Sequence, residues 1–188
     1  MESTATSDAE PQSMRSKRLA SFCTRGFTFG LLSYLVGYLL VAALFVVGPA
    51  NVEGPHDVKL KWFGFAFYNA HFVPIAIGSQ SYNYISQASD PAVPPIVYYA
   101  IPVVSLLATS VVFSARNRLG ETVETVVYSG ASITVGYAAM AIVGAFTFTL
   151  PILGMTAQPD LQKAAAIGAA YPIVLATVAT FAVVFLRR

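Results

Sequence analysis

Four long apolar stretches limit what this chain of 188 residues can fold into. Past its first turn, each stretch lacks Asp, Glu, Lys, Arg and His. Each also has about the twenty residues that an α-helix needs to cross a bilayer. The stretches cover residues 26–47, 95–113, 122–150 and 161–186. The sequence therefore predicts an all-α protein that forms a four-helix transmembrane bundle.

Composition indicates lipid, and not water, around most of the chain. Charged residues make up 11% of the sequence, against about 25% in a soluble domain. The net charge is +2 and no basic face with interleaved aromatic residues is present. We therefore expect the lipid bilayer as a partner and no nucleic acid.

A polar segment precedes a single predicted membrane domain. Residues 1–20 are expected to form a disordered cytoplasmic tail and residues 21–188 the membrane domain, with a long outer connection at 48–94. A signal peptide is the competing interpretation of the first stretch, because basic residues precede it. The apolar core of a signal peptide would have only about 7 to 15 residues, so we favour a retained helix.

Basic residues indicate the orientation in the cell membrane. Eight lie on one side of the predicted helices: Arg15, Lys17, Arg18, Arg25, Arg116, Arg118, Arg187 and Arg188. Three lie on the other: Lys59, Lys61 and Lys163. Cytoplasmic segments of multi-pass proteins carry the excess of Lys and Arg. Both termini are therefore predicted to be cytoplasmic, with 48–94 outside.

The first and third stretches share the pattern S-x-x-V-G-Y-x-x-x-A, beginning at Ser33 and at Ser132. The second and fourth share A-x-P-x-V, around Pro102 and Pro172. Two parallel helical hairpins related by a pseudo-twofold axis would explain both matches. Coincidence within an apolar alphabet is the other explanation, and the sequence leaves both open.

Small residues at helical spacing predict close helix packing in lipid. The candidate packing positions are Gly26, Gly30, Gly37, Gly136, Gly144 and Gly168. Contact within one bundle is the simpler interpretation, and a homodimer through the same faces is the alternative.

The sequence offers little chemistry. An ionisable residue at membrane depth would indicate a proton or ion path, and none is present in the four stretches past their first turns. A metal site needs several ligands close together, and the outer connection offers only His56, Asp57 and His71. We therefore expect no metal, no cofactor and no enzymatic activity.

The most aromatic run of the chain, residues 62–77, lies in the outer connection. Its spacing predicts a short helix at the outer headgroup level, between the first and second spans, because Trp and Tyr favour that boundary. Whether this helix lies on the membrane or dips into it stays open. Its candidate binding residues for a partner or ligand are Trp62, Tyr68, Asn69 and His71. The alternative is that Asn69 and His71 brace the helix against the bundle.

The segment F-Y-N-A-H-F-V at 67–73, which follows a first spanning helix and precedes a proline-kinked second one, resembles a family of uncharacterised multi-pass membrane proteins of halophilic archaea. The resemblance implies a four-helix membrane protein without an assigned activity and supplies no catalytic residues.

Two functions fit these expectations. The first is a structural or accessory subunit that contacts another membrane protein. The second is a small transporter or channel built from two parallel hairpins.

Overall fold

Four long helices form the body of the protein in the computed structural model, which describes residues 9–47, 54–88, 93–117, 123–152 and 154–186. They are α1 (Ala9–Val47), α4 (Pro95–Asn117), α5 (Val123–Thr147) and α6 (Leu161–Leu186). Each is long and apolar enough to cross a membrane. The predicted all-α fold with four spanning helices is therefore confirmed.

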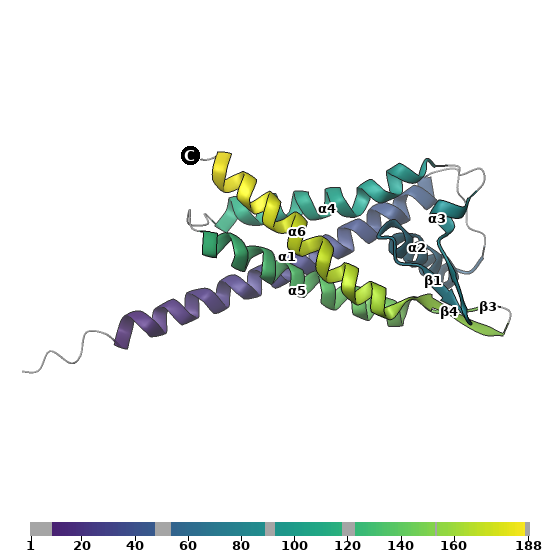
Figure 1. Ribbon diagram of the computed structural model, residues 1–188, viewed down its shortest axis with the longest axis horizontal. Coiled ribbons are helices and arrows are strands. Elements are labelled where there is room, and N and C mark those ends of the chain that lie inside the picture. Colours follow the sequence, from purple (N-terminus) through teal and green to yellow (C-terminus); the bar gives the residue numbers. More distant parts are fainter. Residues whose placement is uncertain (1–8, 48–53, 89–92, 118–122, 153, 187–188) are drawn as a thin grey trace, which may run out of the picture.

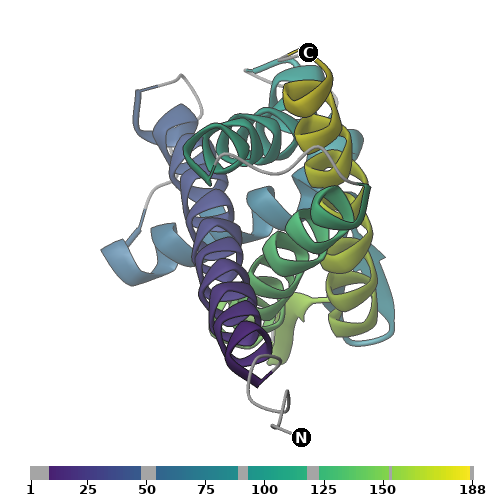
Figure 2. The same cartoon turned by 90° about the vertical axis from the view of Figure 1, so that its left-hand side faces the viewer.

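The four helices pack as a ring in which each has two neighbours. α1 and α6 both contact α4 and α5. The helices alternate in direction, so both ends of the chain lie at one end of the bundle, while a short helix, α2 (His56–Ala70), lies at the other (Figure 1). Seen along the bundle, α2 runs crosswise to the long helices (Figure 2). In this ring α1 lies beside α5 and α4 lies beside α6, and the pair of repeated hairpins stays a prediction.

The first helix is longer than the apolar stretch predicted. α1 begins at Ala9 and not at Gly26, and residues 1–8 of the expected tail lie outside the described residues. Its 39 residues extend about 58 Å at 1.5 Å per residue, against about 30 Å for the hydrocarbon core of a bilayer. The part of α1 before Ala20, where its apolar span starts, projects beyond the other helices (Figure 1).

A small antiparallel sheet, which the sequence did not predict, joins the two outer connections. Its strands are β1 (Ile75–Ile77), β2 (Gln80–Tyr82), β3 (Leu150–Ile152) and β4 (Met155–Pro159), in the order β2-β1-β4-β3. Ala76 of β1 stands opposite Gln158 of β4. Residues 80–82 were expected within the outer connection, without a strand, and 150–152 at the end of a helix or just past it. A helix, α3 (Tyr84–Gln87), follows β2.

α5 ends at Thr147 and not at Leu150, because the chain turns there to pair with β4. Pro151 lies within β3, an edge strand of the sheet. Proline is tolerated on an edge, where its missing N–H faces away from the ladder.

Small residues lie where helices approach most closely. A Cβ atom at Gly30 would collide with the Ile133 carbonyl oxygen, and one at Gly136 with that of Phe27, so α1 and α5 meet backbone to backbone. Gly26 faces Ser132, and Gly168 of α6 faces Ala141 of α5, where an added Cβ would lie 2.7 Å from the Ala141 Cβ. These faces are used inside the bundle, so a homodimer would have to use others.

Gly136→Ala tests the close contact of α1 with α5. The added methyl has no space against backbone atoms of Phe27, and overpacking of this kind costs about 1–3 kcal/mol. We expect a lower midpoint of thermal unfolding in detergent, followed by circular dichroism. Val135→Leu is the matched control, because Val135 is 60% exposed toward lipid. Equal or higher stability of Gly136→Ala would contradict the packing.

Candidate functional site

The helix α2 enters the bundle and does not lie on it. Every residue from Phe63 to Ala70 is buried, and eight consecutive residues cover all sides of an α-helix. Phe65 and Phe67 are both fully shielded. A helix lying flat at the headgroups would keep one face toward water. This part of α2 is instead enclosed by protein, with contacts to α1, α4 and strands of the sheet, so it is a core element and not the interfacial helix that was predicted.

The end of α2 is fixed by a backbone motif. The Val73 N–H donates to the Tyr68 carbonyl at 3.0 Å, and the Phe72 N–H donates to the Asn69 carbonyl at 2.9 Å. This pattern is a Schellman cap, and its left-handed residue is Phe72, with φ of 62°. A bulky residue is disfavoured there, and the Phe72 ring stacks on Tyr99 of α4 at a centroid distance of 4.5 Å.

His71, the residue after α2, is 5% exposed and is hydrogen-bonded through both ring nitrogens. Nδ1 lies 2.7 Å from the Phe67 carbonyl oxygen, and Nε2 faces the hydroxyl of Tyr137 on α5. Because a carbonyl only accepts, Nδ1 carries the proton and Nε2 accepts from Tyr137. Burial lowers the pKa of His71 to about 4, so the ring is neutral near pH 7.

A second set of hydroxyls ties the middle of α2 to the bundle. The Tyr34 hydroxyl of α1 donates to the Tyr68 hydroxyl at 3.0 Å, and Tyr68 donates to the carbonyl of Ala141 on α5. Burial raises the pKa of Tyr68, so this phenol is protonated and acts as a donor. A Cβ at Gly144 would collide with the Tyr34 hydroxyl, which explains the glycine at this point.

Asn69 and Trp62 connect α2 to Tyr84 of α3. The Asn69 side chain is fully buried, donates to the Val73 carbonyl at 2.9 Å and accepts from the Tyr84 N–H at 2.8 Å. The Trp62 ring contacts Phe65 and Tyr84 edge-to-face. The structure thus places all four candidate binding residues against the protein interior. Tyr68, Asn69 and His71 offer no outer surface for recognition.

The tyrosines of the two S-x-x-V-G-Y copies both reach α2. Tyr38 of α1 donates to the Leu60 carbonyl at 3.1 Å, near the start of α2, and Tyr137 of α5 binds His71 at its end. α2 is therefore held at both ends by equivalent positions of the sequence pattern.

Sequence reasoning missed two contacts of α2. Gly64 leaves room for the Phe148 ring, and an added Cβ would collide with it. Gly37, which was expected to pack helices, faces Phe67 of α2, with an added Cβ 2.8 Å from that ring. Both depend on α2 lying inside the bundle, which no local pattern revealed.

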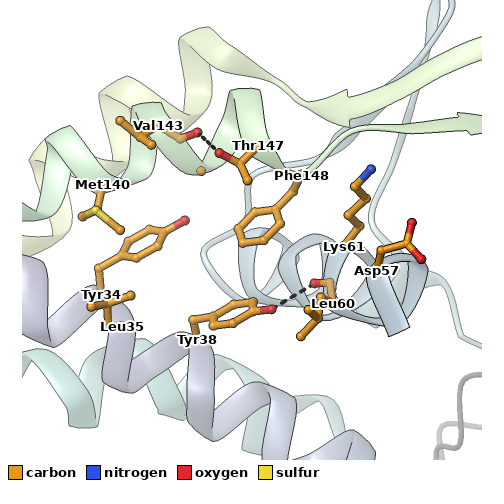
Figure 3. A pocket seen from close by; sticks show the side chains of 11 residues that line it. Tyr34, Leu35, Tyr38, Asp57, Leu60, Lys61, Met140, Val143, Thr147 and Phe148 are labelled. Atoms are coloured by element: carbon orange, nitrogen blue, oxygen red, sulfur yellow. Dashed lines mark hydrogen bonds between the residues drawn. The ribbon is translucent and has the colours of Figure 1, made fainter. Parts of the chain in front are cut away.

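A lateral pocket of about 340 Å³ opens between α1, α2 and α5. Its walls are mostly apolar, with the charged residues Asp57 and Lys61 of α2 to one side (Figure 3). The lining residues are Tyr34, Leu35, Tyr38, Asp57, Leu60, Lys61, Met140, Val143, Gly144, Thr147 and Phe148. They come from three segments far apart in the sequence. Among the described residues, no group of three or more His, Cys, Asp or Glu side chains is placed to hold a metal ion.

Tyr137→Phe tests the bond that holds the end of α2. The substitution leaves the buried Nε2 of His71 without a donor, and an unsatisfied buried polar atom costs about 1–3 kcal/mol. Tyr38→Phe is the matched control, because its bond to Leu60 is at an exposed site. We expect the larger loss of thermal stability in Tyr137→Phe. Equal losses would contradict the role of the His71 bond.

Stability should fall in acid because of His71. The unfolded chain takes up a proton near pH 6.5, whereas the folded protein takes it up only near pH 4. The free energy of unfolding therefore decreases between these pH values, by about 3 kcal/mol for this group. Thermal unfolding at pH 7 and pH 4.5 measures the decrease. His71→Gln, which has no titrating ring, should show a smaller decrease in stability between pH 7 and pH 4.5. If this variant keeps the full pH dependence, His71 is not its cause.

Comparison with known proteins gives a family but no activity. No curated protein and no solved structure matches the chain. A model of the Family of unknown function (DUF7978) matches residues 1–187. The four spanning helices and this match agree with an uncharacterised multi-pass membrane protein. The chain belongs to the Family of unknown function (DUF7978).

Proposed function

We propose that the protein is a non-enzymatic structural or accessory subunit of a membrane complex. The observation that carries this proposal is that α2 occupies the outer mouth of the bundle and engages the polar groups there. His71, Tyr68 and Asn69 each bond to protein partners and are at most 5% exposed. A catalytic group needs access to substrate, so the burial of these groups supports a non-enzymatic role.

The projecting part of α1 is the surface best suited to a partner. Most helical stability comes from packing against neighbours, and this part extends beyond α4, α5 and α6 (Figure 1). The first described ring contact of α1 within the bundle is that of Phe22 with Phe113 of α4, at 5.3 Å. A second membrane protein that packs along the earlier part of α1 would supply the missing neighbour.

A small transporter or channel is the weaker alternative. It would need polar groups directed into a path between the hairpins. Three hydroxyls at depth instead bond to their own helices: Thr109 donates to the Ser105 carbonyl at 2.7 Å, Ser129 to Thr125 at 2.7 Å, and Thr134 to Gly130 at 2.8 Å. This bonding supports a packed bundle over a conduit.

The excess of basic residues at the end that holds both termini supports a cytoplasmic position for that end. The F-Y-N-A-H-F-V segment supports the membrane of a halophilic archaeon as the setting. Under this orientation the partner engages the projecting part of α1 on the cytoplasmic side.

Mass measurement after purification in mild detergent tests the accessory role. We expect the tagged full chain to run as a defined complex, either with a second protein or as a homodimer. A variant that lacks residues 1–19 should lose this association but keep its thermal stability, because the first described ring contact of α1 with the bundle is at Phe22. A lone monomer for the full chain, from native membranes at low detergent, would contradict the proposal.

A further inference from the structure

The geometry points to a lipid-binding site in the lateral pocket between α1 and α5: one chain of an anionic phospholipid fills the pocket and its phosphate pairs with the Lys61 ammonium. The inference concerns a ligand and stands independently of the accessory role.

The position of the pocket favours a chain that enters from the bilayer. Two of its walls, α1 and α5, are spanning helices. Leu35 and Val143, on these two helices, are 42% and 56% exposed, so the walls continue onto the lipid-facing surface. The pocket reaches along α5 from Thr147, its last residue, to Met140, which is about 10 Å of helix.

The size of the pocket suits part of one lipid molecule. Its volume of about 340 Å³ lies at the lower end of ligand sites, roughly 300–1,000 Å³. Gly144 leaves the α5 wall without a side chain, and Figure 3 shows Leu35, Met140 and Val143 at the end of the pocket away from Lys61 and Asp57. An apolar chain would replace no hydrogen bond there.

The polar groups of the pocket select the head group. The Tyr38 hydroxyl donates to Leu60 and the Thr147 hydroxyl donates to Val143, at 2.8 Å in the second case. Both hydroxyl protons are therefore already donated to backbone carbonyls of the protein. Lys61, in contrast, has no carboxylate within salt-bridge distance among the described residues, whereas Lys163 pairs with Asp160 at 3.9 Å.

The other charge near the pocket is that of Asp57, which makes no salt bridge with Lys61 among the described residues. Asp57 lies in the first turn of α2, where the helix dipole favours a negative charge. Figure 3 shows its carboxylate on the same side of the pocket as Lys61, and the two groups form no salt bridge in the part of the chain that the structure describes. An ammonium at the outer end of a chain-sized pocket is complementary to a lipid phosphate, which is why we commit to a phospholipid and not to an apolar side chain of a second protein.

Native mass spectrometry of the full chain, delipidated in detergent, tests the site. Phosphatidylglycerol and phosphatidylcholine with the same acyl chains are titrated in turn. We expect one tightly retained phosphatidylglycerol per protein. Leu35→Trp, which fills the pocket, should weaken retention about tenfold or more. Leu39→Trp is the matched control, since Leu39 is on the same helix, 61% exposed and outside the pocket.

Lys61→Gln tests the head-group contact separately. We expect about a fivefold loss for phosphatidylglycerol, the magnitude of an exposed ion pair, and a smaller loss for phosphatidylcholine, because its choline offsets the charge of its own phosphate. Lys59→Gln, on the same helix but outside the pocket, is the control. Circular dichroism and monodispersity show that each variant is folded, and Val143→Phe provides a second way to fill the pocket.

Equal lipid retention by Leu35→Trp, Val143→Phe and Leu39→Trp would overturn the site. If Leu35→Trp and Val143→Phe lose lipid retention but Lys61→Gln does not, the phosphate contact is overturned. A dimer that forms without lipid and dissociates in Leu35→Trp would assign the pocket to a second copy and overturn the proposal. None of these results would decide whether α1 recruits another subunit.

Discussion

The fold at the α2 end of the bundle depends on a neutral imidazole that must bond through both nitrogens in a place that water does not reach. His71 meets this constraint with the Phe67 carbonyl on one side and the Tyr137 hydroxyl on the other. An unpaired polar atom at this burial is costly. The bond to Tyr137 therefore fixes the end of α2 against α5, and the Schellman cap at Phe72 directs the chain out again toward β1.

The inserted α2 determines the other features of the outer end. Its aromatic rings fill space between α1 and α5 that short side chains on those helices leave open, as Gly37 does for Phe67. β1 follows α2 and pairs with β4, which leads into α6, so the two outer connections become one cap. The lateral pocket is the gap that α2 leaves on the lipid side. The insertion of α2 thus explains both why this end of the bundle is closed and why the lateral pocket is present.

The sequence predicted the parts that hydrophobicity controls. The four spans were found because uncharged runs of that length have one stable form in lipid. The sheet was missed because strands such as Ile75–Ile77 are too short to show alternation and are held by partners far along the chain. For α2, the sequence predicted a helix and singled out His71 and Asn69 as possible braces. It could not predict burial on every side, because that depends on how far α1 and α5 separate, which no local pattern records.

Hydrogen–deuterium exchange of the protein in lipid nanodiscs tests the insertion of α2 most directly. Amides that open only when the bundle unfolds exchange far more slowly than those of a locally mobile helix. If α2 is a core element, the amides of residues 63–71 will be protected to the same degree as those of residues 133–141 in α5. If they exchange orders of magnitude faster than those of α5, α2 lies on the membrane surface and the His71 bond does not organise the fold.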